Sequence, residues 1–484
     1  MQTKKWSLLA LAISAASSQL AYAADEMIGN DDSKDPGVEQ IVADNPGSSQ
    51  AQAEGFIEGS QLMLENRNVA YYHNFRNTEP DTQNYQNEWG QAAMLNFSSG
   101  YTQGLVGFGV DAFANGAVRL NSGAGTGSSP VLPANGSHCD AATGSCQGQE
   151  SYGLAGGAVK VRISETELKA GDLQPNSPVF GTWDGYLMPQ HTNGFMVSSN
   201  EIDSLALQGG HFTSGNADNS TNRDGNLGTS YGWTRVDRAD YIGGDYTFSD
   251  SLSFGLHASN YENVWHQYYA DLYHFWGLSD ETSLLTSINY YNTQDSGDAD
   301  AGKIDTNAFS AALALTTGAH TFTFAHQRVN GDTPFDYLGI SGFSGADNDG
   351  QGYAPAGPIW LANSSQWCDF NAPGEKSYKL QYDLDASAFG LPGLSFMTRY
   401  VKGTDGDGTH ADANGAYGFY NDMQDGKEWE RDVQVAYVVQ DGPLKDLSMT
   451  LRQATYRGNS DASINSGADM DEIRLISSYP LDIF

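Results

Sequence analysis

Lysine and arginine side chains occupy the polar positions of several segments in which every second residue is apolar. An arginine guanidinium forms two parallel hydrogen bonds with a carboxylate. One such pair at about 4 Å, in an effective dielectric near 20, contributes roughly 4 kcal/mol before desolvation. A series of such cations would let an anion move from site to site, because conduction requires binding that is favourable yet weak. The cations in these positions are Arg67, Lys160, Arg162, Arg399, Arg452 and Arg474.

These six cations, which we call the basic ladder, also have a structural interpretation. Each could pair with an acid on the same face, such as Glu65, Glu430 or Asp432. For the set as a whole we favour the ladder. Arg328 and Arg431 fall on apolar positions and are therefore left out of it.

Strands must position the ladder, because its residues alternate with apolar ones. Lys160 and Arg162 alternate with Val159, Val161 and Ile163, and the same period of two recurs in 394–401, 432–440, 447–452 and 473–483. This period places each set of side chains on one side of a sheet. The 12% aromatic residues and 56 Gly also favour strands and turns over helices.

The apolar segments exclude a helical membrane bundle, since none after Ala23 approaches the roughly 20 residues that a membrane helix needs. A chain without such helices can span a bilayer only as a closed barrel. A soluble β-sandwich alternates too. Two features favour the barrel: Lys and Arg are separated from the apolar faces, and tight turns such as 249–251 and 391–393 alternate with long segments such as 213–232 and 403–427.

The first 54 residues differ from the rest. Residues 1–23 have a basic start, an apolar run and the small-x-small pattern of Ala21-Tyr22-Ala23, which predicts a cleaved signal peptide. Residues 24–54 are acidic and rich in Gly, Pro and Ser, and we expect a flexible segment before a barrel over 55–484. The net charge of −35 argues against nucleic acid as a partner.

The chain has three cysteines. Cys139 and Cys146 lie close together in a polar stretch, and in an oxidising compartment they would form a loop disulfide. The role of Cys368 stays open. Only His138 lies near the pair, so a zinc site is not expected, and we predict no metal and no cofactor.

The string Gly228-Thr229-Ser230-Tyr231-Gly232 matches the pattern of a hydrolase nucleophile. Such a nucleophile needs a buried strand before it and a helix after it, whereas a polar loop precedes this string. We therefore expect no catalytic residues and no enzyme, and a barrel-embedded hydrolase remains an alternative.

Several motifs resemble the OprD family of substrate-specific outer-membrane porins, and the resemblance runs from about Gly55 to Phe484. The motifs lie at 101–112, 156–164, 320–323, 331–337, 373–377, 392–397, 437–440 and 474–476. The resemblance implies an 18-stranded barrel, a constriction built by inward-folded loops, and uptake of small carboxylate-bearing molecules. Family members that take basic amino acids place an acid just before a stretch like Trp360-Leu361-Ala362-Asn363, and no acid stands there in this chain.

Two segments are candidates for the constriction loops. The segment 171–191 carries Trp183 and Tyr186, which could supply apolar and hydrogen-bonding walls. In the segment 332–360, Asp336 and Tyr337 would form an electronegative side opposite the arginines. A plain surface loop is the alternative for the segment 171–191. A carboxylate facing an arginine wall produces a transverse field that orients zwitterions.

The sequence thus predicts an all-β protein, a transmembrane antiparallel β-barrel with long extracellular loops folding into the lumen. We expect a porin in the outer membrane of a Gram-negative bacterium, in contact with outer-membrane lipid and lipopolysaccharide, that passes small organic acids. The alternatives are a channel for amino acids, peptides or oligosaccharides, and a plugged structural barrel. The resemblance favours a monomer or a weak trimer.

Overall fold

The computed structural model describes residues 50–76, 78, 81–127, 131–140, 142–143, 145–340, 354–355, 357 and 359–484. The predicted signal peptide and residues 24–49 of the predicted flexible segment lie outside this part. Gln50, at the start of the short 3-10 helix η1 (Gln50–Gln52), is buried, and its side-chain amide donates to the carbonyl of Thr102 at 2.8 Å.

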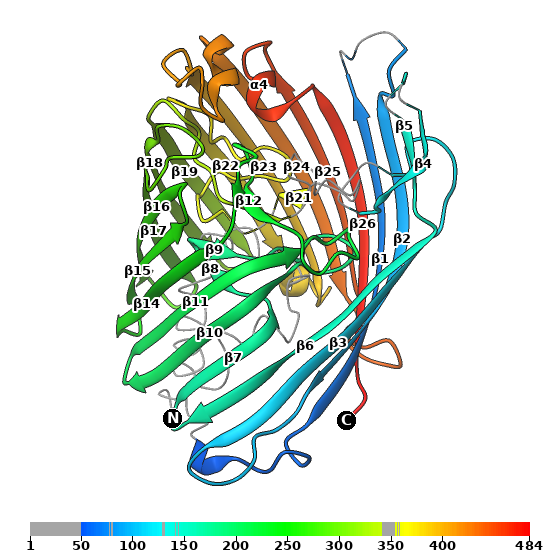
Figure 1. The fold of residues 1–484 in the computed structure, drawn as a ribbon, viewed down its shortest axis with the longest axis vertical. Helices are drawn as coiled ribbons and strands as arrows, with labels where there is room; N and C mark the ends of the chain where they lie inside the picture. The colour runs from blue at the N-terminus through cyan, green and yellow to red at the C-terminus, as the bar shows by residue number, and fades with distance from the viewer. Residues whose placement is uncertain are drawn as a thin grey trace.

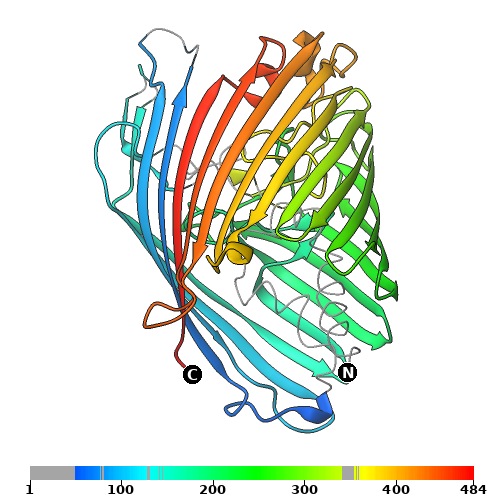
Figure 2. The same ribbon diagram turned by 180° about the vertical axis from the view of Figure 1, so that it is seen from behind.

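Eighteen antiparallel strands form one closed barrel, which confirms the predicted fold. Closure follows from β1, which pairs with β2 on one side and with the last strand, β26, on the other. Figures 1 and 2 show this seam, where the red end of the chain lies beside the blue beginning. The barrel strands are β1 (Gln61–Phe75), β2 (Tyr85–Ser98), β3 (Gly107–Arg119), β6 (Ser151–Ile163), β7 (Thr166–Leu173), β10 (His191–Ile202), β11 (Leu205–Asn216), β14 (Ala239–Ser249), β15 (Leu252–Tyr261), β16 (Trp265–Gly277), β17 (Thr282–Asp295), β18 (Asp305–Thr317), β19 (His320–Asn330), β22 (Lys376–Asp385), β23 (Leu394–Gly406), β24 (Gly426–Val438), β25 (Ser448–Gly458) and β26 (Met470–Asp482).

The predicted alternation of faces is present. In β6, Lys160 is 5% exposed while its neighbour Val159 is 59% exposed. In β26, Arg474 is likewise buried while its neighbour Leu475 is exposed. Because loops fill much of the interior, residues that face the lumen are buried, and those that face outward are exposed.

Short turns join the strands at one end, and the long connections lie mostly at the other, where the helix α4 (Ser463–Ser466) stands in Figure 1. The turn between β6 and β7 has only two residues, 164 and 165. The long connections include 120–150, 174–190, 217–238, 331–375 and 407–425. None of the helices in the described ranges is long or apolar enough to cross a bilayer.

Short strands inside the loops tie these connections together. A four-stranded sheet joins loop 217–238 to loop 331–375, through β12 (Leu227–Thr229) and β20 (Leu338–Ile340). The remaining short elements are β4 (Ala134–Asp140), β5 (Ser145–Gly148), β8 (Asn176–Ser177), β9 (Phe180–Gly181), β13 (Arg235–Val236), β21 (Ala354–Pro355), η2 (Ala386–Phe389) and η3 (Gly418–Asp422).

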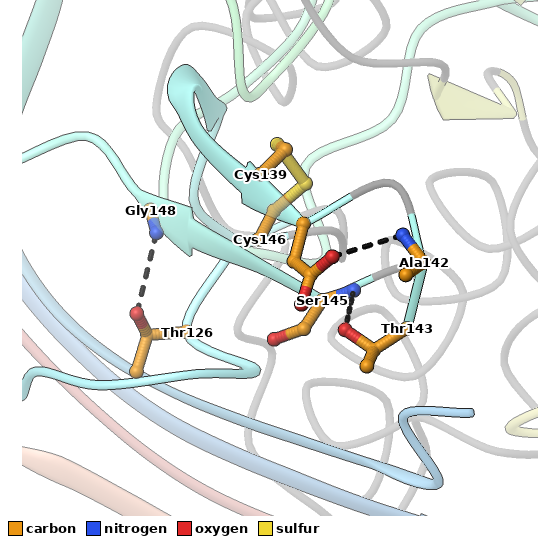
Figure 3. The surroundings of a disulfide bond; sticks show 8 residues. Thr126, Cys139, Ala142, Thr143, Ser145, Cys146 and Gly148 are labelled. Carbon is orange, nitrogen blue, oxygen red and sulfur yellow. Dashed lines mark hydrogen bonds between the residues drawn. A yellow bond between two sulfur atoms is a disulfide. The ribbon is translucent and has the colours of Figure 1, made fainter. Parts of the chain in front are cut away.

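A disulfide joins Cys139 of β4 to Cys146 of β5 (Figure 3). The hairpin belongs to loop 120–150 and pairs as a small sheet of its own, outside the barrel ladder. Cys368 is a buried free thiol in loop 331–375.

Candidate functional site

Loop 174–190 crosses the interior of the barrel. On one side its residues Leu187 and Met188 pack against Val69 and Tyr71 of β1. On the other, the hydroxyl of Tyr291 in β17 donates to the carbonyl of Pro178 at 3.0 Å. The loop therefore touches strands on two sides of the lumen and narrows it.

Arg67 of the predicted ladder fixes this loop to the wall. It is 2% exposed, and its two terminal nitrogens donate to the two carboxylate oxygens of Asp184 at 2.6 and 3.1 Å. It also donates to the carbonyl of Tyr186 at 3.1 Å and to Glu65 at 3.0 Å. Because a buried charge is costly without partners, Arg67 and Asp184 together hold the loop in place.

Loop 331–375 enters from the opposite part of the wall. The backbone N–H groups of Trp367 and Cys368 donate to the carboxylate of Glu430 in β24 at 2.9 and 2.8 Å. The carbonyl of Gln366 accepts from Arg474 at 3.3 Å. Tyr186 of the first loop lies with its ring centroid 5.1 Å from the Arg474 guanidinium. Arg474 thus contacts both inward loops.

The cross-strand register brings several cations into one row. Arg474 of β26 lies directly opposite Arg452 of β25, and Arg399 of β23 lies opposite Gln381 of β22. Lys379 of β22 also faces inward and is 2% exposed. With Arg67 on β1, these residues form a wall over β22 to β1 that we call the cationic wall.

Most cations of this wall have an acid beside them. The Nε of Arg399 donates to Asp432 at 2.5 Å. Arg474 is hydrogen-bonded to Glu472. Arg452 differs, since its Nε donates to the amide oxygen of Gln434 at 2.6 Å and, within the described residues, no carboxylate lies within ion-pair distance of it. Arg452 is also half-buried, so its guanidinium has capacity for an anion.

Lys160 and Arg162 lie apart from the wall, on β6. Lys160 pairs with Asp111 at 2.7 Å, and the Arg162 guanidinium lies 4.0 Å from the ring centroid of Tyr101. Lys169 of β7 joins the same group through Asp111 at 3.3 Å. The predicted ladder is therefore divided between two parts of the barrel.

Asp336 is enclosed where three loops meet, and it is 3% exposed. Its carboxylate accepts from the backbone N–H groups of Tyr231, Gly232 and Tyr337 at 3.0, 2.7 and 2.7 Å, and from the Tyr417 hydroxyl at 2.9 Å. Burial raises the pKa of Asp336 to about 6 despite these donors. A carboxylate engaged in this way joins loops and leaves little surface for a passing solute.

Tyr337 and Tyr231 both donate their hydroxyls to Asp369 at 2.8 Å, beside the Asp336 junction. Trp183 lies in loop 174–190, where its backbone N–H donates to the side-chain Oε1 of Gln190 at 3.0 Å. Ser230 is buried, and its hydroxyl donates to the carbonyl of Leu338 at 2.7 Å. Within the described ranges, no group of His, Cys, Asp or Glu is arranged to hold a metal ion.

Two inward-facing lysines, Lys379 and Lys169, were not predicted from the sequence, although the alternation of polar and apolar residues around each one indicates its face. In β22, Lys379 shares its face with Ser377 and Gln381, while Tyr378 and Leu380 occupy the other face. Lys169 likewise follows Leu168 in an alternating segment. Asp184 had no such signal, because it lies in a loop without periodicity.

Comparison with known proteins adds four findings. The family described as outer membrane porin, OprD family, matches residues 54–483. Porin D of Pseudomonas aeruginosa is 41% identical over the full length of both chains. A crystal structure of P. aeruginosa OprD is 40% identical with a TM-score of 0.75, covering 90% of this chain and 99% of that one. The structure of P. aeruginosa OpdK with vanillate is 32% identical with a TM-score of 0.74, covering 88% of this chain and all of that one.

Proposed function

Since this chain belongs to the OprD family of outer-membrane porins, we propose that it passes small carboxylate-bearing solutes by passive diffusion through a constriction lined by arginine. The observation that carries the proposal is the pair Arg452 and Arg474. These cations face each other across β25 and β26, and Arg474 contacts both inward loops. Like charges directly opposite each other repel, so an anion between them would be stabilised by both.

The asymmetry of the interior supports the same pathway. Strands β11 to β17 face the lumen with aromatic residues such as Tyr241, Trp265 and Tyr291, which form one large buried cluster with the loops. A charged solute would gain little binding energy from contacts with these aromatic residues. The cationic wall lies on the remaining side, where guanidinium groups can replace part of the water around a carboxylate.

Two further facts agree with a carboxylate solute. Vanillate, the compound named with the related OpdK structure, carries a carboxylate. The segment before Trp360-Leu361-Ala362-Asn363 has no adjacent acid, which disfavours basic amino acids. A channel for neutral oligosaccharides would have no need of Arg452 without an acid partner. A hydrolase is not supported, because Ser230 is buried and bonded to a carbonyl.

The first experiment is planar-bilayer recording of the mature protein and of Arg452→Gln in a KCl gradient. We expect the parent to prefer anions. The variant should lower the anion-to-cation permeability ratio by about tenfold if the lost attraction is close to 1.4 kcal/mol. Lys445→Gln removes one exposed charge from the short turn between β24 and β25, seven residues before Arg452 and outside the barrel strands, and serves as the control.

Unchanged ion selectivity in Arg452→Gln would contradict the proposal. A parent protein that prefers cations would contradict it as well. A similar loss of anion preference in Lys445→Gln would instead assign the selectivity to overall charge.

A further inference from the structure

A second row of cations lies on the outside of the barrel. Arg328 of β19, Lys376 of β22, Lys402 of β23, Arg431 of β24 and Arg457 of β25 all occupy outward-facing positions toward the end with long loops. Arg328 and Arg431 are the two arginines that fall on apolar positions of the alternating pattern. We call these five residues the outer cation row.

The register makes this row continuous over five neighbouring strands. Arg328 lies directly opposite Lys376. Lys402 pairs with Trp429 and is therefore diagonal to Arg431, two residues farther along β24. Trp429 in turn pairs with Arg457. Like charges directly opposite each other destabilise a sheet, so such a row gains stability if an anion lies along it.

The charges of the row are only partly neutralised within the protein. Arg328 and Lys402 are exposed, and no acid among the described residues lies within ion-pair distance of either. Within the part of the chain that the structure describes, Arg431 bonds only to neutral partners, the side chains of Gln453 at 3.2 Å and Thr455 at 3.4 Å. Lys376 and Arg457 pair with Asp405 and Asp471, both at 2.8 Å. The row is therefore positive on a chain whose net charge is −35.

Aromatic residues fix the level of the row relative to the bilayer. Tyr378, Tyr400 and Trp429 share its face and its strands, and the rings of Tyr400 and Trp429 are stacked at 5.8 Å. Girdles of aromatic residues mark the membrane–water interface of such barrels. Exposed apolar residues, including Leu380 and Val433, follow on the side of the short turns.

We propose that the outer cation row binds the phosphate groups of lipid A, the phosphorylated glycolipid of the outer leaflet. The long loops of an outer-membrane barrel face outside, so the row lies at the headgroup level of that leaflet. Lipid A carries two phosphates on one disaccharide, and a row of cations over several strands can contact both. Lysine and arginine stems can lie along apolar surface while their charged ends reach the headgroups.

The experiment measures binding of diphosphoryl lipid A to the folded, detergent-solubilised protein by native mass spectrometry, with monophosphoryl lipid A and phosphatidylglycerol as competitors. The test variant is Arg328→Gln/Lys402→Gln/Arg431→Gln. The matched control, Arg235→Gln/Lys303→Gln/Lys445→Gln, removes three exposed charges from loops and a turn. We expect the test variant to bind diphosphoryl lipid A about tenfold or more weakly, and the control to bind like the parent.

Three results would overturn the proposal: parent-like binding in the test variant, an equal loss in the control, or binding of phosphatidylglycerol as tight as that of lipid A. Heat-modifiable migration of each variant verifies that the barrel is folded. Ion selectivity in bilayers should be unchanged in the test variant, so this proposal and the proposed function fail independently.

Discussion

Arg452 and Arg474 face each other across two strands, yet their surroundings differ. Arg474 is 4% exposed, is bonded to Glu472 and touches both inward loops. Arg452 is half-buried and bonded to a neutral amide. Removing one partner of a buried pair leaves an uncompensated charge. Arg474 therefore combines a structural role with its position on the path, whereas Arg452 is the cation best placed to bind and release a solute.

Asp184→Asn tests the structural role of a ladder residue. The change removes the carboxylate that holds Arg67, and breaking a buried ion pair costs about 3–5 kcal/mol. We expect loop 174–190 to detach locally, with a larger mean single-channel current and more current noise. The released Arg67 should also increase anion preference.

The control for this prediction is Asp237→Asn, which breaks the ion pair with Arg235. The Asp237 side chain is 75% exposed in this pair. Exposed pairs contribute about 0–1 kcal/mol, so currents should match the parent. Parent-like current noise in Asp184→Asn would show that Asp184 does not hold the loop.

At the scale of elements, the strands were predictable and the loops were not. Alternation in β6 already indicated that Lys160 faces one side and Val159 the other, because a period of two leaves no other choice in a sheet. The same reading would have found Lys379. The bond between Arg67 and Asp184 spans 117 residues and involves a loop without periodicity. No local pattern in the sequence encodes such a contact.

The role of Asp336 illustrates the same limit. We expected an electronegative wall, and the carboxylate is instead enclosed by donors from two other loops. Each donor is a backbone N–H or a hydroxyl whose position depends on the folded loop. The residue type was therefore informative, but its surroundings were not accessible from the sequence.

The Asp336 junction should depend on pH. Burial raises the pKa of Asp336 from 3.8 to about 6, so between these values the folded state holds a proton that the unfolded state has released. The contribution of Asp336 to the stability of the loop junction is therefore highest below pH 3.8, and it falls as the pH rises through about 6. Burial also raises the pKa of the adjacent Asp369, which acts in the same direction.

We therefore expect fewer gating events in single-channel records at pH 5 than at pH 7.5. Asp336→Asn has no titrating group at this position and should lose most of the difference in gating between the two pH values. If this variant keeps the full pH step of the parent, another group controls the loops.

The disulfide should matter to its hairpin and not to the barrel. Cys139 and Cys146 are separated by seven positions, and closing so small a ring restricts the unfolded chain by about 2–3 kcal/mol. Reduction should speed proteolysis within 120–150 while conductance stays the same. The variant Cys139→Ser/Cys146→Ser should behave like the reduced parent, with no further response to reductant. A reduced barrel that loses heat-modifiable migration would contradict this assignment.

The whole molecule combines a strongly acidic chain with a cationic interior wall. Of 24 Lys and Arg against 59 Asp and Glu, several are gathered on adjacent strands from β22 to β1. Acids in the long loops would repel an anion at the entrance, while the wall attracts it farther in. Such an arrangement disfavours anions without specific contacts and favours solutes that the wall binds, as expected of a selective pore.

The lipid-facing and lumen-facing cations have different tasks on this account. The cationic wall faces the solute path, and the outer cation row faces the membrane. Both follow from the alternation of faces along β22 to β25, where Lys379 and Tyr378 point to opposite sides. One stretch of the barrel can thereby serve transport inside and lipid contact outside.

The most direct test of the carboxylate path compares two solutes of similar size and opposite charge. Proteoliposomes would take up labelled 4-hydroxyphenylacetate or tyramine, with protein-free vesicles as the blank. We predict that the carboxylate enters several-fold faster through the parent and loses most of this advantage in Arg452→Gln. Equal rates for both solutes, or faster entry of the amine, would contradict the central claim.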